Sequence, residues 1–167
     1  MTHGRRAAIA LGANVGDRAA TFASARAALR ALDRVVPLGA VADVVTTAHG
    51  AVPQPDFLNG MLLVRTTRTP CDLLDALHDI EAAHGRVRDV PKGPRTLDLD
   101  LVWVEGVASD DPACLLPHPG LGERPWLHDQ LAALCGRGVA DAARARVAAR
   151  VVHDPRESLP TTEAVPA

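Results

Sequence analysis

Hydrophobic positions recur along the chain in two rhythms, and each rhythm predicts one type of element. Unbroken or alternating apolar runs are typical of strands, whereas apolar residues spaced three or four apart are typical of helices. Strands are therefore expected over 7–12, 35–45, 57–65 and 97–105, with a break near Pro37 to Gly39 in the second. Helices are expected after the N-cap residues Asp17 and Thr69, ending near Leu32 and before Gly85, and over 125–134 and 139–152.

The order of these elements predicts the fold. Strand, helix, strand, strand, helix and strand form the βαββαβ arrangement of ferredoxin-like α+β proteins, an antiparallel sheet with helices packed on one face. The last two helices are extra elements near the C-terminus, and residues 106–124 before them are expected to be irregular. We expect a single domain over 1–154, which is long enough for one substantial core, and a disordered tail over 155–167.

Two carboxylates stand two positions apart in the last predicted strand. Side chains of a strand alternate between its faces, so Asp98 and Asp100 share one face. The opposite face is expected to carry Leu97, Leu99, Leu101 and Trp103. At roughly 6 Å and an effective dielectric of about 20, the two charges repel each other by on the order of 3 kcal/mol. A divalent cation, which prefers oxygen ligands, would offset this repulsion.

A basic loop lies directly before this strand and carries Arg86, Arg88, Lys92 and Arg95. Guanidinium groups suit bidentate contacts with phosphate. The loop and the two acids together predict a site for a metal–polyphosphate complex. Each part also has a simpler interpretation, because D-x-D patterns occur in unrelated metal enzymes, acids can point to solvent, and a run of charge can be a solvated surface.

Aromatic residues are scarce, with two Trp, two Phe and no Tyr, so their positions are informative. Phe57 and Asn59 share a strand face, and a ring beside an amide suits a flat heterocycle. For this pair alone, Phe57 in the core and Asn59 at a strand edge is the simpler interpretation. Arg124 and Trp126, also two apart, offer a cation and a second flat surface.

Three further features each have two interpretations. His118 lies between two prolines and can donate to a phosphate or satisfy a turn. Glu81 can orient an arginine or lie on a helix surface, and the surface position is the simpler interpretation. The turn from Gly12 to Gly16 lacks the pattern of known phosphate-binding loops, so it is expected only to link a strand tightly to a helix.

Charge and cysteine content narrow the class of protein. A net charge of -2 gives no general basic surface, which argues against a nucleic-acid binder. Three cysteines without a C-x-x-C pattern predict free thiols in a reducing compartment. The apolar run near the N-terminus is too short for a signal peptide or a membrane span. We therefore expect a cytoplasmic protein with no nucleic-acid or membrane partner.

Five segments resemble, in order, those of the 6-hydroxymethyl-7,8-dihydropterin pyrophosphokinases of folate biosynthesis. These segments are Leu11–Asp17, Pro55–Asn59, Gly85–Arg88, Gly93–Asp100 and Leu116–Pro119. The resemblance spans about residues 7 to 135, and the string from Gly93 to Asp100 is highly specific. The family has a ferredoxin-like core, in agreement with the order of elements. The resemblance implies transfer of the β,γ-diphosphate of ATP to the pterin hydroxymethyl oxygen, with AMP as the other product.

The resemblance also implies how ATP would be held. Asp98 and Asp100 would bind two Mg²⁺ ions that bridge the phosphates and the attacking oxygen, and Asp98 is a candidate to accept the hydroxymethyl proton. The triphosphate would be held by Arg86, Arg88, Arg95, His118 and Arg124. Of these, Arg86 and Arg95 count with the two acids as catalytic residues. Glu81 matches a family position that supports the site.

For the pterin, the resemblance implies a place between the rings of Phe57 and Trp126. Asn59 and the segment from Thr46 to Gly50 would bind its hydrogen-bonding edge. We expect a monomer whose partners are two small molecules, ATP and the pterin. A non-catalytic ferredoxin-like nucleotide-binding module is the alternative, and another D-x-D enzyme, such as a nucleotidyl or glycosyl transferase, is a third; the ring site argues against both.

The chain departs from the family in the basic loop. Lys92 stands where a tryptophan is common, and Asp89 stands where a basic residue is common. The segment from Arg88 to Gly93 is also short. Closure of this loop over bound substrates is therefore expected to differ from that in other members.

Overall fold

The computed structural model of the chain describes residues 4–48, 53–87 and 93–151. Its strands are β1 (Arg5–Ala13), β2 (Val35–Ala40), β3 (Val44–Thr46), β4 (Phe57–Thr66) and β5 (Asp98–Val104). Its helices are α1 (Arg18–Ala31), α2 (Pro70–Ala83), α3 (Gly120–Glu123), α4 (Pro125–Cys135) and α5 (Arg137–Val151). The tail over 155–167, for which disorder is expected, lies outside the described residues.

β1 lies inside one antiparallel sheet, between β4 and β5. The strand order is β2-β4-β1-β5, and β3 pairs with β4 next to β2. β2 and β3 together occupy the place of the second strand in the βαββαβ arrangement. The predicted α+β class with a ferredoxin-like order of elements is confirmed.

The second predicted strand, over 35–45, is two strands. The interruption lies at residues 41–43, between β2 and β3, and not near Pro37 to Gly39, where the ladder with β4 only shifts its register. Among the described residues, β2 pairs only with β4, so its other edge has no strand partner there and Pro37 need not donate a ladder hydrogen bond. This explains why the proline stays within the strand.

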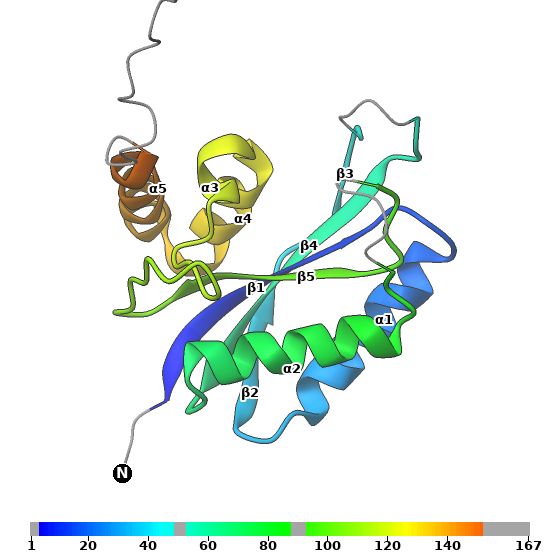
Figure 1. Cartoon of the computed structure of the whole chain (residues 1–167), viewed down its shortest axis with the longest axis horizontal. Coiled ribbons are helices and arrows are strands. Elements are labelled where there is room, and N and C mark those ends of the chain that lie inside the picture. Colours follow the sequence, from blue (N-terminus) through cyan, green and yellow to red (C-terminus); the bar gives the residue numbers. More distant parts are fainter. Residues whose placement is uncertain (1–3, 49–52, 88–92, 152–167) are drawn as a thin grey trace, which may run out of the picture.

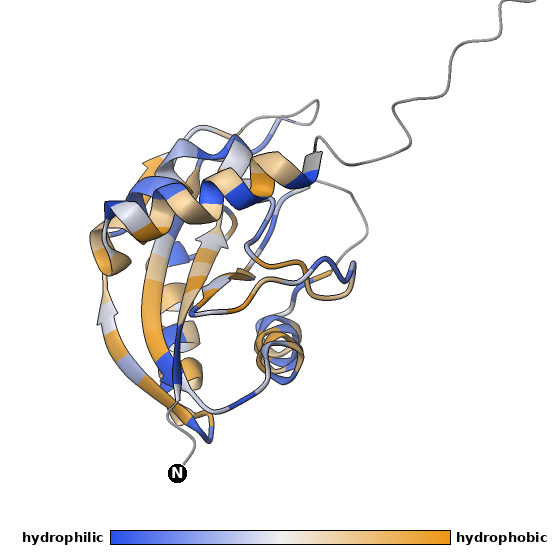
Figure 2. Cartoon of the chain, turned by 90° about the vertical axis from the view of Figure 1, so that its left-hand side faces the viewer, coloured by the Kyte–Doolittle hydropathy of each residue, from blue (hydrophilic) through white to orange (hydrophobic). Residues whose placement is uncertain are grey.

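Helices cover both faces of the sheet (Figure 1). On one face, α1 and α2 supply a core of Phe22, Leu29, Leu73, Leu77 and Ile80. On the other face, α3, α4 and α5 supply Leu121, Leu127, Leu131 and Val147. The expectation of helices on a single face is incomplete, because the C-terminal helices pack their apolar residues against the opposite face of the sheet. Most strand residues are accordingly apolar (orange in Figure 2). β1, β4 and β5 are buried for most of their length, whereas β2 and β3 at the edge are largely exposed.

β5 does not keep a strict alternation of faces. Ile9 pairs with Leu101 and Ala8 pairs with Trp103, so a bulge at Val102 inserts one extra residue. Trp103 therefore packs with Val102 against the core of the C-terminal helices, and the guanidinium group of Arg6 lies 5.7 Å from the centre of its ring. The prediction that Trp103 shares a face with the leucines is wrong for this reason.

The two predicted helix starts are confirmed. The Asp17 carboxylate accepts a hydrogen bond from the Ala20 amide at 3.0 Å, and the Thr69 hydroxyl accepts one from the Asp72 amide at 3.2 Å. The region over 106–124 is less irregular than expected, since it contains α3 and a bridge between Ser109 and Leu116. Within the described parts of the chain, no helix has both the length and the apolar composition needed to cross a membrane.

Candidate active site

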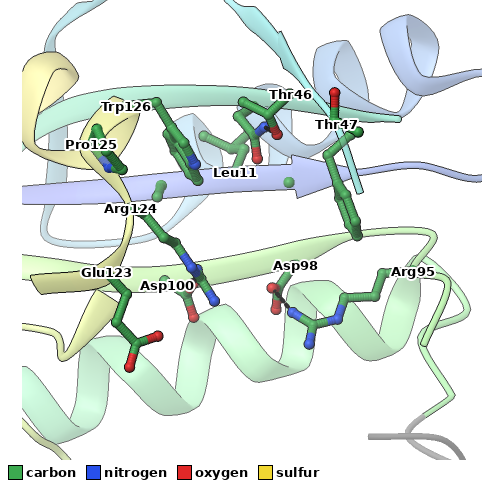
Figure 3. A pocket seen from close by; sticks show the side chains of 14 residues that line it. Leu11, Thr46, Thr47, Arg95, Asp98, Asp100, Glu123, Arg124, Pro125 and Trp126 are labelled. Carbon is green, nitrogen blue, oxygen red and sulfur yellow. Dashed lines mark hydrogen bonds and ion pairs between the residues drawn. The ribbon is translucent and has the colours of Figure 1, made fainter. Parts of the chain in front are cut away.

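A cavity of about 350 Å³ opens on the side of the sheet that carries α3 and α4 (Figure 3). Its walls are Ala10, Leu11, Gly12, Thr46, Thr47, Phe57, Asn59, Arg95, Asp98, Asp100, Glu123, Arg124, Pro125 and Trp126. Figure 3 shows Arg95, Asp98 and Asp100 on one side of it and Thr46 and Trp126 on the other. Charged residues thus gather at one end of the cavity, and flat or neutral polar ones gather at the other.

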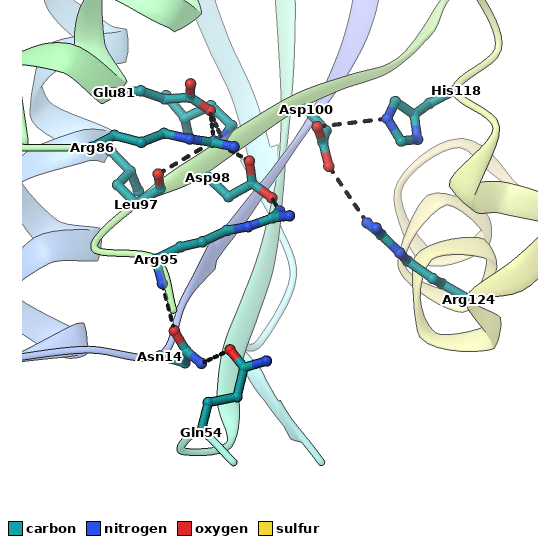
Figure 4. A network of polar contacts seen from close by, with 11 residues as sticks. Asn14, Gln54, Glu81, Arg86, Arg95, Leu97, Asp98, Asp100, His118 and Arg124 are labelled. Carbon is teal, nitrogen blue, oxygen red and sulfur yellow. Dashed lines mark hydrogen bonds and ion pairs between the residues drawn. The ribbon is translucent and has the colours of Figure 1, made fainter. Parts of the chain in front are cut away.

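Asp98 is the centre of the charged network (Figure 4). One carboxylate oxygen accepts a hydrogen bond from Arg86 and the other accepts one from Arg95. Arg86 is held in turn by Glu81 of α2, which also accepts a hydrogen bond from the Leu99 amide at 2.7 Å. Glu81 is only 2% exposed, because α2 packs against β5 at this point. The surface interpretation of Glu81 is wrong, and its role in orienting an arginine is confirmed.

The fold shifts the pKa values of the two carboxylates in opposite directions. Burial alone would raise the pKa of Asp98, but the positive charges of Arg95 and Arg86 outweigh it and lower that pKa. The pKa of Asp100 is raised, first by burial and then by the negative charge of Asp98. Asp98 is therefore held firmly as an anion, whereas the negative charge on Asp100 is only partly compensated.

Asp100 has an arginine and a histidine nearby but at a distance. Its carboxylate oxygens lie 3.6 Å from Nε2 of His118 and 3.6 Å from Nη1 of Arg124. Both separations are longer than a hydrogen bond. Among the described residues, no side chain donates a hydrogen bond to Asp100. This leaves room for a further positive group beside its carboxylate.

Of the two roles considered for His118, the structure shows the turn contact, and donation to a phosphate stays a prediction. Its Nδ1 accepts a hydrogen bond from the Gly120 amide at 3.0 Å, which satisfies the turn into α3. In the neutral ring, the proton then lies on Nε2, the nitrogen that faces Asp100. Its own amide donates to the carbonyl of Val102 at 2.9 Å and fixes the residue beside β5. The ring can thus donate a hydrogen bond into the site.

The other end of the cavity is neutral. Asn59 is 4% exposed, and its amide donates to the hydroxyl of Thr46 at 2.7 Å across the β3–β4 ladder. Phe57 belongs to neither hydrophobic core and lines the cavity instead. Trp126, at the start of α4, also lines the cavity and packs against the core of the C-terminal helices. The simpler interpretation, with Phe57 in the core, therefore does not describe this chain. Two rings and a buried amide border one space.

A second hollow, of about 280 Å³, meets the first at Asp98 and Asp100. Its apolar walls come from Leu74 of α2, Leu101 of β5 and the segment 112–116. Arg86 and His118 also line it. The two acids therefore stand between a hollow with aromatic walls and a hollow with aliphatic walls.

Some residues of the site escape sequence reasoning. Asn14 is 2% exposed: its carbonyl oxygen accepts from the Arg95 amide at 2.8 Å, and its amide group donates to Gln54 and Pro55. The turn at Gly12 to Gly16 thus does more than link a strand to a helix, since it fixes Arg95. An asparagine at the end of a buried strand is the available signal. Glu123, which lines the cavity beside Arg124, carries no such signal.

Two predicted site residues, Gly50 and Arg88, lie outside the described residues, as do Asp89 and Lys92. All the other predicted site residues border one or both hollows. The described residues contain no group of three or more His, Cys, Asp or Glu arranged to hold a metal ion. Asp98 and Asp100 are then two carboxylates from which a metal ion could take only part of its ligands. Such a sparse set suits Mg²⁺, which usually keeps waters and takes further ligands from substrate phosphates.

Comparison with known proteins agrees with the resemblance found in the sequence. The family model described as 7,8-dihydro-6-hydroxymethylpterin-pyrophosphokinase (HPPK) matches residues 8–136. A 2-amino-4-hydroxy-6-hydroxymethyldihydropteridine pyrophosphokinase of Methylorubrum extorquens is 38% identical over 122 residues, covering 73% of this chain and 77% of that protein. A protein of the same name from Pseudomonas aeruginosa is 38% identical over 133 residues, covering 78% and 80%. One from Bacillus subtilis is 34% identical over 127 residues, covering 76% of each chain.

Proposed function

Because the chain belongs to the 7,8-dihydro-6-hydroxymethylpterin-pyrophosphokinase family, we propose that it transfers diphosphate from ATP to 6-hydroxymethyl-7,8-dihydropterin. The products are AMP and the pterin methyl diphosphate, an intermediate of folate biosynthesis. The observation that carries the proposal is the meeting of two unlike hollows at Asp98 and Asp100. One suits a flat heterocycle, the other suits a nucleotide, and the reacting groups would meet between them.

The pterin occupies the hollow with aromatic walls. Its bicyclic ring lies between Phe57 and Trp126, which offer flat apolar surfaces. Asn59, already oriented by Thr46, presents its amide to the polar edge of the ring. The hydroxymethyl group then points toward the acids at the charged end of the same cavity.

ATP occupies the second hollow, with its phosphates directed at the acids. The base packs near Leu74 and Leu101, and the triphosphate passes between Arg86, Arg95, His118 and Arg124. These groups spread positive charge around the transferred diphosphate, and the charge is in place before the reaction starts. Arg88, beyond the described residues, remains part of the proposed phosphate-binding set.

Asp98 and Asp100 would hold two Mg²⁺ ions in this proposal. Bound there, the ions would neutralise phosphate charge and align the attacking and leaving oxygens. The partly uncompensated charge on Asp100 supports this role, since a cation placed beside it replaces the missing counter-charge. Asp98 accepts hydrogen bonds from Arg86 and Arg95 and so holds both guanidinium groups beside the proposed phosphate site.

No side chain needs to act as a covalent nucleophile. The hydroxymethyl oxygen attacks the β-phosphorus, the bond between the α-phosphate oxygen and that phosphorus breaks, and AMP leaves. Asp98 is within the site to accept the hydroxymethyl proton, but its lowered pKa makes it a weak base. Alignment and charge neutralisation therefore supply most of the acceleration.

An assay that separates nucleotides tests the proposal directly. The protein is incubated with ATP, Mg²⁺ and 6-hydroxymethyl-7,8-dihydropterin, and the products are resolved by chromatography. AMP and pterin methyl diphosphate should form in equal amounts and only when all three are present. Pterin-dependent ADP, or no product from well-folded protein, would contradict the proposal. ATP binding that is indifferent to Mg²⁺ and pterin would instead support a non-catalytic nucleotide-binding module.

We further infer that the enzyme acts in the cytoplasm as a monomer on small molecules alone. Its three cysteines are free thiols, and its net charge of -2 offers no general basic surface for nucleic acid. Light scattering coupled to gel filtration would test the monomer. A mass of twice 17.5 kDa would contradict it.

A further inference from the structure

The last turn of α5 reaches back to the loop that carries His118. The family match ends at residue 136, one position before α5 begins at Arg137, so this helix is not part of the matched region. Ala140, Ala143 and Val147 anchor it in the core on its face of the sheet. Arg150 lies about one turn further along α5, and its side chain extends toward the loop over 109–117.

Arg150 contacts this loop at four points. Nη1 donates to the carbonyl of Pro117 at 3.2 Å, and Nη2 donates to the carbonyls of Leu116 and Ser109, both at 3.0 Å. Nε donates to the Asp110 carboxylate at 2.8 Å. A guanidinium group has five N–H donors, so four of them are used on a single loop.

These contacts fall on the closing point of the loop. Ser109 and Leu116 form a two-residue bridge in which each amide donates to the other's carbonyl, at 2.9 and 3.0 Å. Arg150 fills the second acceptor position of both carbonyls. The next carbonyl it contacts belongs to Pro117, which directly precedes His118. The guanidinium group therefore fixes the base of the segment that presents the imidazole to Asp100.

We propose that Arg150 is a positioning residue for the nucleotide half of the active site, an inference that rests on the function proposed above. The loop forms one wall of the hollow assigned to ATP, through residues 112–116 and His118. None of its residues lines the hollow assigned to the pterin. Arg150 thus acts directly on the wall of the hollow assigned to ATP, and it reaches the hollow assigned to the pterin only indirectly, through His118 and α3.

Three variants separate this role from a merely structural one. Arg150→Ala should raise the KM for ATP by about three- to tenfold, because a loop wall and His118 lose their fixed position, while the KM for the pterin should rise clearly less. Arg150→Lys should fall between this variant and the wild type, since an ammonium group cannot reach three carbonyls and a carboxylate together. Asp110→Asn keeps the carbonyl contacts and should have a small effect.

Arg144→Ala is the matched control, because Arg144 lies on the same helix and pairs with Asp141 at 3.8 Å. It should change neither KM. Hydrogen exchange of amides in 107–118 should speed up in Arg150→Ala and not in Arg144→Ala, a readout that does not depend on which reaction the protein catalyses. Equal rises in both KM values, an unchanged exchange rate, or an Asp110→Asn effect as large as that of Arg150→Ala would overturn the proposal.

Discussion

At the scale of the residue, Asp98 and Asp100 show how strongly the surroundings of a carboxylate determine its pKa. Asp98 is enclosed by Arg86 and Arg95, whereas Asp100 has Arg124 and His118 at 3.6 Å. The same chemical group is therefore stabilised as an anion at one position and is costly as an anion two residues later. This difference gives two separate expectations for the same substitution.

Replacing either acid should abolish catalysis. In the proposed site, both Asp98→Asn and Asp100→Asn remove an oxygen ligand and a charge that the Mg²⁺–ATP complex needs, so kcat/KM should fall by about a hundredfold or more. Steady-state assays of AMP release measure this loss. Asp79→Asn, an exposed carboxylate on α2, is the control and should match the wild type. Near-normal turnover in either variant would remove that acid from the metal site.

The same two substitutions should change stability in opposite directions. Asp98→Asn leaves Arg86 and Arg95 without their anion and should lower the free energy of unfolding by about 2–4 kcal/mol at neutral pH. Asp100→Asn removes a charge that burial and Asp98 disfavour, so it should leave that free energy unchanged or raise it. Urea unfolding in the absence of ligands measures both. Destabilisation by Asp100→Asn of the same size as by Asp98→Asn would contradict this assignment.

The pH dependence of these differences follows from the direction of each shift. The folded state lowers the pKa of Asp98 below its usual value of 3.8, so its contribution is present above that pH and is lost as the pH falls through the lowered value. The folded state raises the pKa of Asp100, so the cost of its charge is present above the raised value and disappears as the pH falls through it. Acidification should therefore bring both variants closer to the wild type.

Thiol reactivity should differ sharply between two cysteines. Cys71 is exposed, whereas burial, followed by the neighbouring Cys71, raises the pKa of Cys114 to about 11. A thiolate is the reactive form, so an alkylating reagent at pH 8 should label Cys71 and leave Cys114 unmodified in the folded protein. Peptide mass spectrometry identifies the site. Labelling of Cys114 in native Cys71→Ser protein at the rate of unfolded protein would contradict this.

The residues of the site were predictable from sequence where their chemistry stands out locally. The spacing of Asp98 and Asp100 places both on one face, and the structure agrees. The bulge at Val102 was not predictable, because its register depends on pairing with β1, far away in sequence. The burial of Glu81 and the contacts of Asn14 likewise depend on which distant segment packs against them.

At the scale of the element, the turn after β1 joins three segments that are far apart in the chain. Asn14 exchanges backbone and side-chain hydrogen bonds with Arg95 and also contacts Gln54 and Pro55. Arg95 begins the approach to β5, and Gln54 and Pro55 precede β4. One buried side chain thus sets the relative position of the phosphate-binding and pterin-binding ends of the proposed site.

Asn14→Ala should therefore affect both stability and turnover. It removes the hydrogen bonds of a buried side chain to the part-buried Arg95 amide and to the Pro55 carbonyl, which should cost about 1–3 kcal/mol in the free energy of unfolding. It also frees Arg95, which should lower kcat. Thr69→Ala is a stability-matched control, since losing that N-cap should cost about 1 kcal/mol at the end of α2 away from Glu81. If both variants kept wild-type kcat, Asn14 would be structural only.

Helices and strands whose boundaries follow from the local sequence were predictable. Those whose boundaries depend on pairing with a distant strand were not. Asp17 and Thr69 are N-cap residues, and an N-cap side chain predicts the start of its helix from the local sequence. The split of 35–45 into β2 and β3 follows from how β4 is paired along its length, which no local pattern encodes. The short helix α3 was missed because four residues carry too little periodicity to detect.

At the scale of the whole molecule, the two tryptophans report on different regions. Trp126 lines the cavity assigned to the pterin, whereas Trp103 lies beside Ala8 and under Arg6, away from the cavity lining. A bound pterin should therefore change the fluorescence of Trp126 and leave that of Trp103 unchanged. Titration of Trp103→Phe should retain the signal, and titration of Trp126→Phe should lose it. The reverse result would place the pterin elsewhere.

The position of β1 inside the sheet has a consequence for how the protein folds. β1 is made first, yet its partner on one side, β5, lies near the far end of the family region, so that Gly12 pairs with Asp98. During synthesis, the hydrogen-bonding edge of β1 that faces β5 must wait until most of the chain has left the ribosome. Such long-range pairing is slow, because the entropy of closing a long loop is lost before any contact forms. The docking of β5 also positions both acids, so the same late event completes the sheet and assembles the proposed catalytic centre.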